Sequence, residues 1–252
     1  MKTFLHIVLF VMVASSSLFG VVTITPVELG EKPGWSSKVG VSLSTKRGNS
    51  DVDAYKLSAR TNYDNNISYV TWFQLSGEYG QASGEKNVQK SFAHLRYIHN
   101  LTDKYHVYET ALQSEEDEFR LIKSRRLAAV GYRQHLFPKE RLKTFVGLGV
   151  MYEYIKFTSS YDPTEYNVRA SCYLSMSYEF EKDKKLSFIS YFQPKLDDVE
   201  DFVTVNQLGL KIKIEGELYL NFSLSYNYDA RPAIEVESEY DFSQDTAFIY
   251  EF

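Results

Sequence analysis

The sequence predicts an all-β fold, a single antiparallel transmembrane β-barrel of about 12 strands of the outer-membrane type. First, segments of roughly ten residues alternate between apolar and polar side chains, with turn residues between them. Second, the chain begins with the pattern of an export signal. Third, aromatic residues make up 15% of the chain, yet no apolar run after the leader reaches the roughly 20 residues of a spanning helix.

Residues 1–20, MKTFLHIVLFVMVASSSLFG, have the three parts of a secretory signal peptide. Lys2 supplies the positive charge, residues 4–14 form an uncharged apolar run, and small residues follow up to Gly20. We therefore expect a cleaved signal peptide at 1–20, a periplasmic N-terminal segment at 21–34 and the barrel at 35–252. The expected location is the outer membrane of a Gram-negative cell.

The first six strands are predicted at 35–46, 52–62, 69–80, 87–99, 105–115 and 122–135. The first three alternate clearly, and their apolar faces carry Val39, Val41, Leu43, Tyr55, Leu57, Ala59, Phe73, Leu75 and Tyr79. The fifth and sixth are less regular. In 122–135 neither face is clearly apolar, so which of its side chains face the barrel interior stays open.

The last six strands are predicted at 142–156, 166–181, 185–193, 203–214, 217–229 and 239–252. Most alternate strictly; 218–228 places Leu220, Phe222 and Leu224 opposite Asn221 and Ser223. The strand 185–193 is the least regular of these. The last strand must pair with the first to remove the open edge of the sheet. Its aromatic residues are expected to face lipid and to act as a signal for the barrel-assembly machinery: Phe248, Tyr250 and Phe252.

The connections fall into two alternating sets. Turn-like connections at 64–67, 100–104, 137–141, 182–185 and 215–217 are expected on the periplasmic side, and generally longer ones outside, the asymmetry of outer-membrane barrels. The acidic stretch SEEDE (114–118) is expected in an outer loop. A solvated loop is the favoured interpretation, because a divalent-cation site needs several converging oxygens.

Alternation alone does not decide whether the apolar face meets lipid outside or packs inside a soluble barrel. The polar faces are rich in Gly and Ser, as in 171–177, which suits the inside of a closed barrel. Several tyrosines lie near predicted strand ends, where interfacial girdles form. These features favour contact with outer-membrane lipid. A soluble periplasmic barrel that binds an apolar ligand remains the alternative.

With this assignment, charges of both signs point into the lumen and are expected to pair across it. The predicted lumen-lining charges are Lys38, Lys56, Arg60, Glu78, Arg96, Glu109, Glu153, Glu179, Lys211, Lys213 and Glu251. A rigid, charge-filled structural barrel is the favoured interpretation, and a narrow selective pore or small-ligand pocket is the alternative.

Signals for catalysis and for cofactors are weak. None of His94, His99, His106 and His135 has a metal-ligand partner at a suitable spacing, and the chain contains no G-x-S-x-G or H-E-x-x-H motif. Serines near His94 leave an outer-membrane lipid hydrolase as a minor alternative. We expect no enzyme, no metal and no cofactor. The formal net charge of −5 argues against nucleic acid as a partner, and Cys172, the only cysteine, cannot form an intramolecular disulfide.

Several motifs together resemble one family. Trp35 with VGVSLSTKRGNSD (39–51), LRYIHNLTDKY (95–105), Arg126 with GYR (131–133) and the alternating strand ending in Phe252 resemble the domain-of-unknown-function 481 family. Its members are described as salt-induced outer-membrane proteins, YdiY-like. The resemblance covers roughly 35–252 and implies an outer-membrane barrel, possible involvement in salt or osmotic stress, and no assigned mechanism. The stretch 234–244 and the sixth strand depart from the family pattern.

Overall fold

The computed structural model describes residues 29–46, 52–82, 85–118, 120–136, 139–158, 163–234, 236 and 239–252. Within them the chain forms twelve strands, Gly34–Lys46 (β1), Val52–Asp64 (β2), Tyr69–Ala82 (β3), Glu85–Asp103 (β4), His106–Asp117 (β5), Ile122–Leu136 (β6), Leu142–Phe157 (β7), Glu165–Glu181 (β8), Lys184–Pro194 (β9), Phe202–Glu215 (β10), Leu218–Asp229 (β11) and Tyr240–Glu251 (β12). Every predicted strand is present. The predicted signal peptide and the GNSD loop lie outside the described residues. No helix in the described part of the chain has the length and apolar character needed to cross a bilayer.

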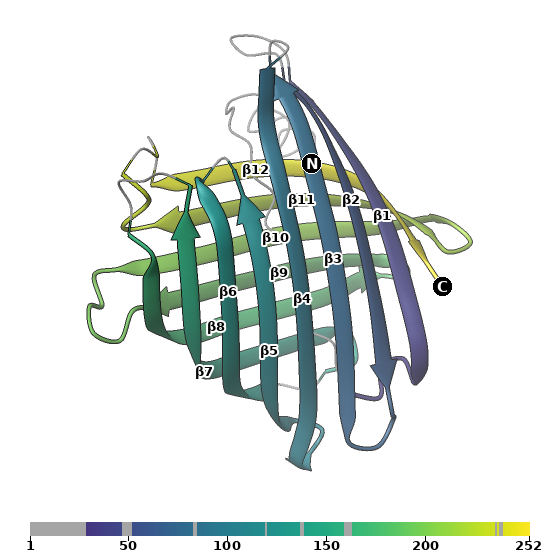
Figure 1. Ribbon diagram of the computed structural model, residues 1–252. Helices are drawn as coiled ribbons and strands as arrows, with labels where there is room; N and C mark the ends of the chain where they lie inside the picture. Colours follow the sequence, from purple (N-terminus) through teal and green to yellow (C-terminus); the bar gives the residue numbers. More distant parts are fainter. Residues whose placement is uncertain are drawn as a thin grey trace, which may run out of the picture.

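The strands close into one antiparallel barrel, in which each strand pairs with its sequence neighbours and β12 returns to β1 (Figure 1). Figure 1 shows β2–β6 running steeply across the near wall and β8–β12 crossing behind them, the strong tilt that closing a sheet requires. The seam between β1 and β12 is short, joining Lys38–Ser42 to Ala247–Glu251. Reciprocal backbone hydrogen bonds between Ser37 and Phe252 extend it by one pair. The predicted all-β, outer-membrane-type barrel is confirmed.

The two ends of the barrel are named here by the connections that they carry. One end, here called the turn end, carries the connections 65–68, 104–105, 137–141, 182–183 and 216–217; the opposite end is called the loop end. In the first of these turns, the Asn65 side chain accepts hydrogen bonds from the N–H groups of Ile67, Ser68 and Tyr69. Such side-chain capping explains why a short polar segment reverses the chain.

The acidic stretch 114–118 corrects one prediction. It does not form an outer loop, because β5 continues to Asp117. Glu115 and Asp117 are buried and point into the lumen, where Lys90 pairs with both. The alternation of inward- and outward-facing side chains in β5 therefore continues to Asp117. A prediction from composition assigns these acidic residues to a solvated loop.

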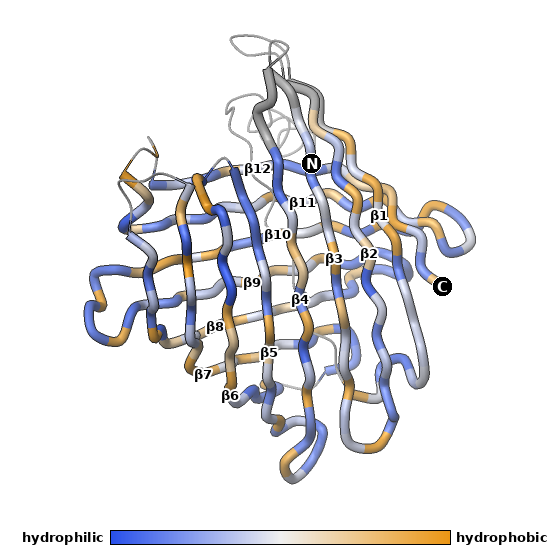
Figure 2. The backbone as a smooth tube through the Cα atoms, in the orientation of Figure 1, coloured by the Kyte–Doolittle hydropathy of each residue, from blue (hydrophilic) through white to orange (hydrophobic). Residues whose placement is uncertain are grey.

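Large apolar side chains cover the outside of the barrel. Leu57, Val130 and Leu148 are each between 58 and 59% exposed, and similar residues occur on every strand. In Figure 2 the orange, apolar segments recur along the strands between blue segments. Soluble monomers rarely expose such extensive apolar surface, whereas lipid covers it in a membrane barrel. This face argues against a soluble barrel with an apolar interior.

Aromatic rings gather at both ends of this apolar surface. At the turn end, successive ring centroids along Trp35, Tyr63, Tyr69, Tyr97 and Tyr108 lie 5.0–6.2 Å apart. Ring pairs at the loop end are Tyr154–Tyr166, Phe192–Phe202, Phe202–Tyr228 and Tyr226–Tyr240. Two aromatic belts at the ends of an apolar band are typical of outer-membrane barrels.

The orientation of β6, which the sequence left open, is settled by the structure. Val130 and Tyr132 are exposed on the outside, whereas Arg133 and His135 are buried. The inward face of β6 therefore includes Arg125, which the sequence pattern did not identify as a lumenal residue.

The segment just before β1 lies against the turn end of the lumen. Leu29 is buried in an apolar cluster with Val70, Trp72, Ile98 and Val107. The Gly30 N–H donates to an Asp64 carboxylate oxygen at 2.7 Å. These contacts hold residues 29–33 across part of the turn-end opening.

Candidate functional site

An ionic network fills the loop-end half of the lumen beside β4–β8. The Glu153 carboxylate accepts hydrogen bonds from Arg125 at 2.6 Å and Arg169 at 2.9 Å. The same network includes Lys90, Glu115, Asp117 and Asp201. All seven are largely buried, so the charges compensate one another in an environment where an unpaired charge is costly. We call these seven residues the loop-end network.

Strand register brings this network together. Glu153 pairs with Leu127 on β6, and Arg125 lies two residues before Leu127. On its other side Glu153 pairs with Asn167 on β8, and Arg169 lies two residues after Asn167. Diagonal positions on one face of a sheet are within reach of long side chains. Glu153 was predicted to face the lumen, but its two arginine partners were not, because the orientation of β6 and the register were unknown.

A second set of large side chains fills the middle of the lumen. Tyr173 donates a hydrogen bond to Glu109 at 2.8 Å, and Arg96 lies 3.6 Å from the same carboxyl group. Tyr191 packs against Tyr173 in a tilted arrangement, with ring centroids 5.0 Å apart. The Tyr173 ring occupies the space beside Gly147, where an added Cβ would lie 2.0 Å from the ring. Glycine on β7 thus admits the ring that closes this part of the lumen.

The opposite side of the lumen is lined by small residues and stays open. A cavity of about 330 Å³ lies at the turn end, and a second of about 140 Å³ lies deeper. The deeper cavity is bordered by Gly40, Ser42, Ser58, Ser223 and Ala247, from β1, β2, β11 and β12. The two cavities share four lining residues, so they adjoin: Lys38, Arg60, Asn221 and Ile249.

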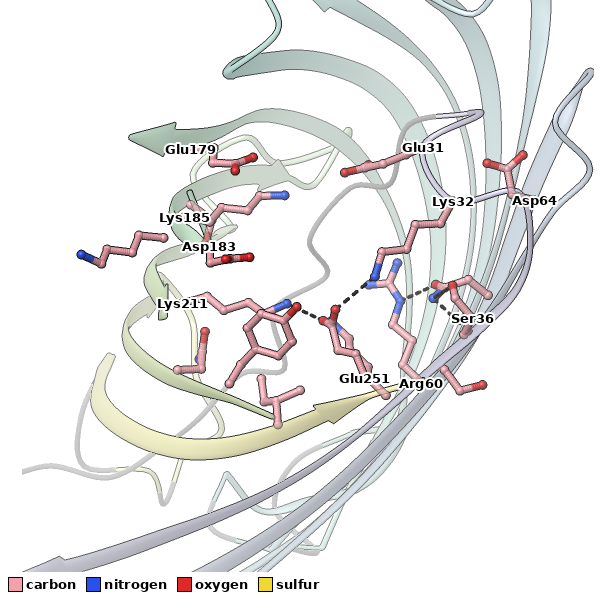
Figure 3. A pocket seen from close by; sticks show the side chains of 18 of the residues that line it. Glu31, Lys32, Ser36, Arg60, Asp64, Glu179, Asp183, Lys185, Lys211 and Glu251 are labelled. Carbon is pink, nitrogen blue, oxygen red and sulfur yellow. Dashed lines mark hydrogen bonds and ion pairs between the residues drawn. The ribbon is translucent and has the colours of Figure 1, made fainter. Parts of the chain in front are cut away.

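Figure 3 shows the turn-end cavity, with Glu251 between Lys211 and Lys32. Lys211 also lies over the Tyr219 ring, 3.8 Å from its centroid. Lys32 precedes the first strand. Burial opposes its charge, but the Glu251 carboxylate outweighs this and raises the pKa of the lysine. The segment before β1 thus contributes a charge to the wall of the cavity.

The predicted lumen-lining charges divide into three groups. Arg96, Glu109 and Glu153 belong to the filled side of the lumen. Around the open side lie Lys38, Lys56, Arg60, Glu179, Lys211 and Glu251. Glu78 has a carboxylate oxygen buried without a hydrogen-bond partner among the described residues, and Lys213 lies near the turn end, 3.9 Å from Asp183. The sequence pattern gave no indication of this separation into a filled and an open side.

His94 and His135 pack inside the barrel against aromatic rings. The His94 ring is buried, with Nδ1 3.3 Å from the Gln113 side chain and the ring stacked with Phe92. His135 packs against Phe145 with ring centroids 4.6 Å apart. No group of three His, Cys, Asp or Glu side chains in this part of the chain is arranged to hold a metal ion.

Comparisons with known proteins give a family. Residues 39–252 match the model of the family described as "Protein of unknown function, DUF481". A search of curated proteins found no match. Similar solved structures include the NanC porin (11% identity, 86% of this chain and 98% of that chain covered, TM-score 0.46) and the KdgM porin (11%, 86% and 99%, 0.45). The translocator domain of autotransporter NalP from Neisseria meningitidis is also similar (11%, 88% and 90%, 0.48).

Proposed function

The chain belongs to the DUF481 family, and on that premise we propose that it is an outer-membrane barrel whose lumen provides a narrow polar passage for small solutes. Support for the location comes from the apolar outer surface between two aromatic belts. The turn end, where Gly34 and Glu251 lie, is the proposed periplasmic side. The resemblance to the DUF481 family implies a role in salt or osmotic stress, and in that role small solutes would move through this passage.

The unequal filling of the lumen carries this proposal. On the β4–β8 side, long side chains interlock through hydrogen bonds and ion pairs and leave a cavity of about 100 Å³, smaller than either seam-side cavity, so this half resists the passage of solute. On the β1, β2 and β10–β12 side, glycine, alanine and serine leave two adjoining cavities. Ser225 and Ser243 are buried and extend the same small-residue wall toward the loop end. The passage would therefore follow the seam side of the barrel.

Filling the seam-side cavities with a large side chain should remove most of the conduction while leaving the barrel wall intact. Ser223 borders the deeper cavity and is buried, so Ser223→Tyr places a ring in the open space. We expect the wild-type barrel in planar bilayers to give small conductance steps, and the variant to lose most of that conductance. The Ser223 backbone pairs with β10 and β12 are unaffected by the side-chain change.

Thr246→Tyr provides the matched control, because Thr246 alternates with the inward-facing Asp245 and Ala247 and points outward. This variant should conduct like the wild type. Absence of conductance steps from correctly folded wild-type protein would refute the proposed passage. Equal conductance in wild type and Ser223→Tyr would place the path elsewhere and contradict the seam-side route.

A further inference from the structure

The junction between the two seam-side cavities has an unusual charge distribution. Of the four residues that line both cavities, Lys38 and Arg60 are basic, and the others are Asn221 and Ile249. Among the residues that the structure describes, the shared stretch is therefore lined by two cations and no carboxylate. Lys56 adds a third cation to the wall of the deeper cavity, where Asp245 is the one carboxylate among the described lining residues.

Lys38 has no hydrogen-bond or ion-pair partner among the residues that the structure describes. It pairs across the sheet with Arg60 on β2 and with Glu251 on β12. Glu251 is already engaged by Lys211 and Lys32. A lumenal ammonium group without a direct counterion carries a desolvation cost that a bound anion would remove.

The carboxylates of the turn-end cavity are mostly engaged by other groups. Asp64 accepts hydrogen bonds from the Gly30 and Asn66 N–H groups, and Asp183 lies 3.9 Å from Lys213. Glu31 pairs with Lys143 at 3.2 Å. Glu179 is exposed, at the end of β8 and opposite Lys185. These carboxylates are therefore engaged mainly by other groups, although Glu31 and Glu251 also act electrostatically on Arg60 and neutralise part of the charge at the junction.

The contacts that hold Arg60 in place at the junction include a hydrogen bond and an aromatic face. Its Nε donates to the Asn62 side chain at 2.8 Å, and its guanidinium carbon lies 4.4 Å from the centroid of the Trp72 ring. Stacking on an aromatic face fixes the plane of a guanidinium, which can bind an oxyanion through two parallel hydrogen bonds. A fixed guanidinium next to an ammonium group is a suitable pair for one anionic group.

From this geometry we infer that the junction at Lys38 and Arg60 is a binding site for a small oxyanion, such as a carboxylate, sulfate or phosphate group. The inference rests on the proposed passage and names its solute class: small anionic molecules that enter from the turn-end cavity. Lys185 lines that cavity and would attract the anion toward the junction.

Trp72 provides a direct probe of this site. The chain has only two tryptophans, so Trp35→Phe leaves Trp72 as the sole indole, in contact with Arg60. In detergent-solubilised, folded barrel, sodium sulfate added at constant ionic strength should change the Trp72 emission and reach saturation. Adding Lys38→Gln removes one cation without adding bulk and should raise the apparent Kd for sulfate at least tenfold.

Lys123→Gln is the matched control, because Lys123 is exposed on β6 and lines neither cavity. It should leave the sulfate Kd unchanged. A non-saturating response, or the same Kd with and without Lys38→Gln, would overturn the anion site. The titration does not depend on conduction, so sulfate binding without conductance would refute only the passage, and conductance without sulfate binding would refute only the anion site.

Discussion

Deleting Phe252 is expected to reduce strongly the amount of folded barrel in the membrane. The seam is the shortest pairing of the barrel, and Phe252 exchanges two backbone hydrogen bonds with Ser37, at 2.6 and 2.8 Å. Each is worth about 1 kcal/mol net, and more where lipid replaces water as the alternative partner. The deletion also removes an exposed ring, whose centroid lies 6.1 Å from that of Tyr250. The folded fraction is measured by the heat-modifiable gel shift of membrane fractions.

Two variants separate the causes. Phe252→Ala keeps the hydrogen bonds of the seam and should give an intermediate folded fraction. Deletion of Thr164, an exposed residue outside the strands, shortens the chain equally and should have little effect. Equal folded fractions for the Phe252 and Thr164 deletions would contradict the importance of the seam residue.

Glu153→Ala is expected to destabilise the barrel by about 3–5 kcal/mol, the cost of removing one partner from a buried ion pair. Glu153 is 2% exposed and receives hydrogen bonds from two arginines on different strands, β6 and β8. Without it, Arg125 and Arg169 keep Glu115 and Asp201 but lose the carboxylate between them. Urea unfolding of barrels in lipid vesicles measures the change in the free energy of unfolding.

Glu181→Ala breaks a control ion pair. Glu181 pairs with Lys184 at 2.8 Å, but the two side chains are 61% and 38% exposed. Such a surface pair contributes at most about 1 kcal/mol. Similar unfolding midpoints for Glu153→Ala and Glu181→Ala would show that the loop-end network contributes no more than a surface contact.

Much of the fold was predictable because a lipid-facing strand must alternate. The period of two located all twelve strands, and the aromatic clusters located the belts. The largest difference in strand length is at β4, which runs from Glu85 to Asp103 instead of 87–99. The resemblance to the DUF481 family is confirmed over 39–252. These features depend on local sequence and on the environment outside the barrel.

The arrangement inside the lumen was less predictable, because it depends on register between strands. Arg125 became a lumenal residue only once the orientation of β6 was known, and Asp117 was assigned to a loop because acidic stretches are usually solvated. The separation into filled and open sides depends on which large side chains, such as Tyr173, meet small ones, such as Gly147, across strands. The insertion of Leu29 among lumenal residues also has no signal in a single sequence.

The central claim is that the apolar face of these strands lies in lipid, and Cys172 tests it most directly. This residue is the only cysteine, and it pairs across the sheet with Leu148 and Phe192, both exposed on the outer face. In isolated outer membranes, a lipid-soluble maleimide should label Cys172, and a charged, membrane-impermeant maleimide should label it only after denaturation. Rapid labelling of the folded protein by the charged reagent would contradict the account.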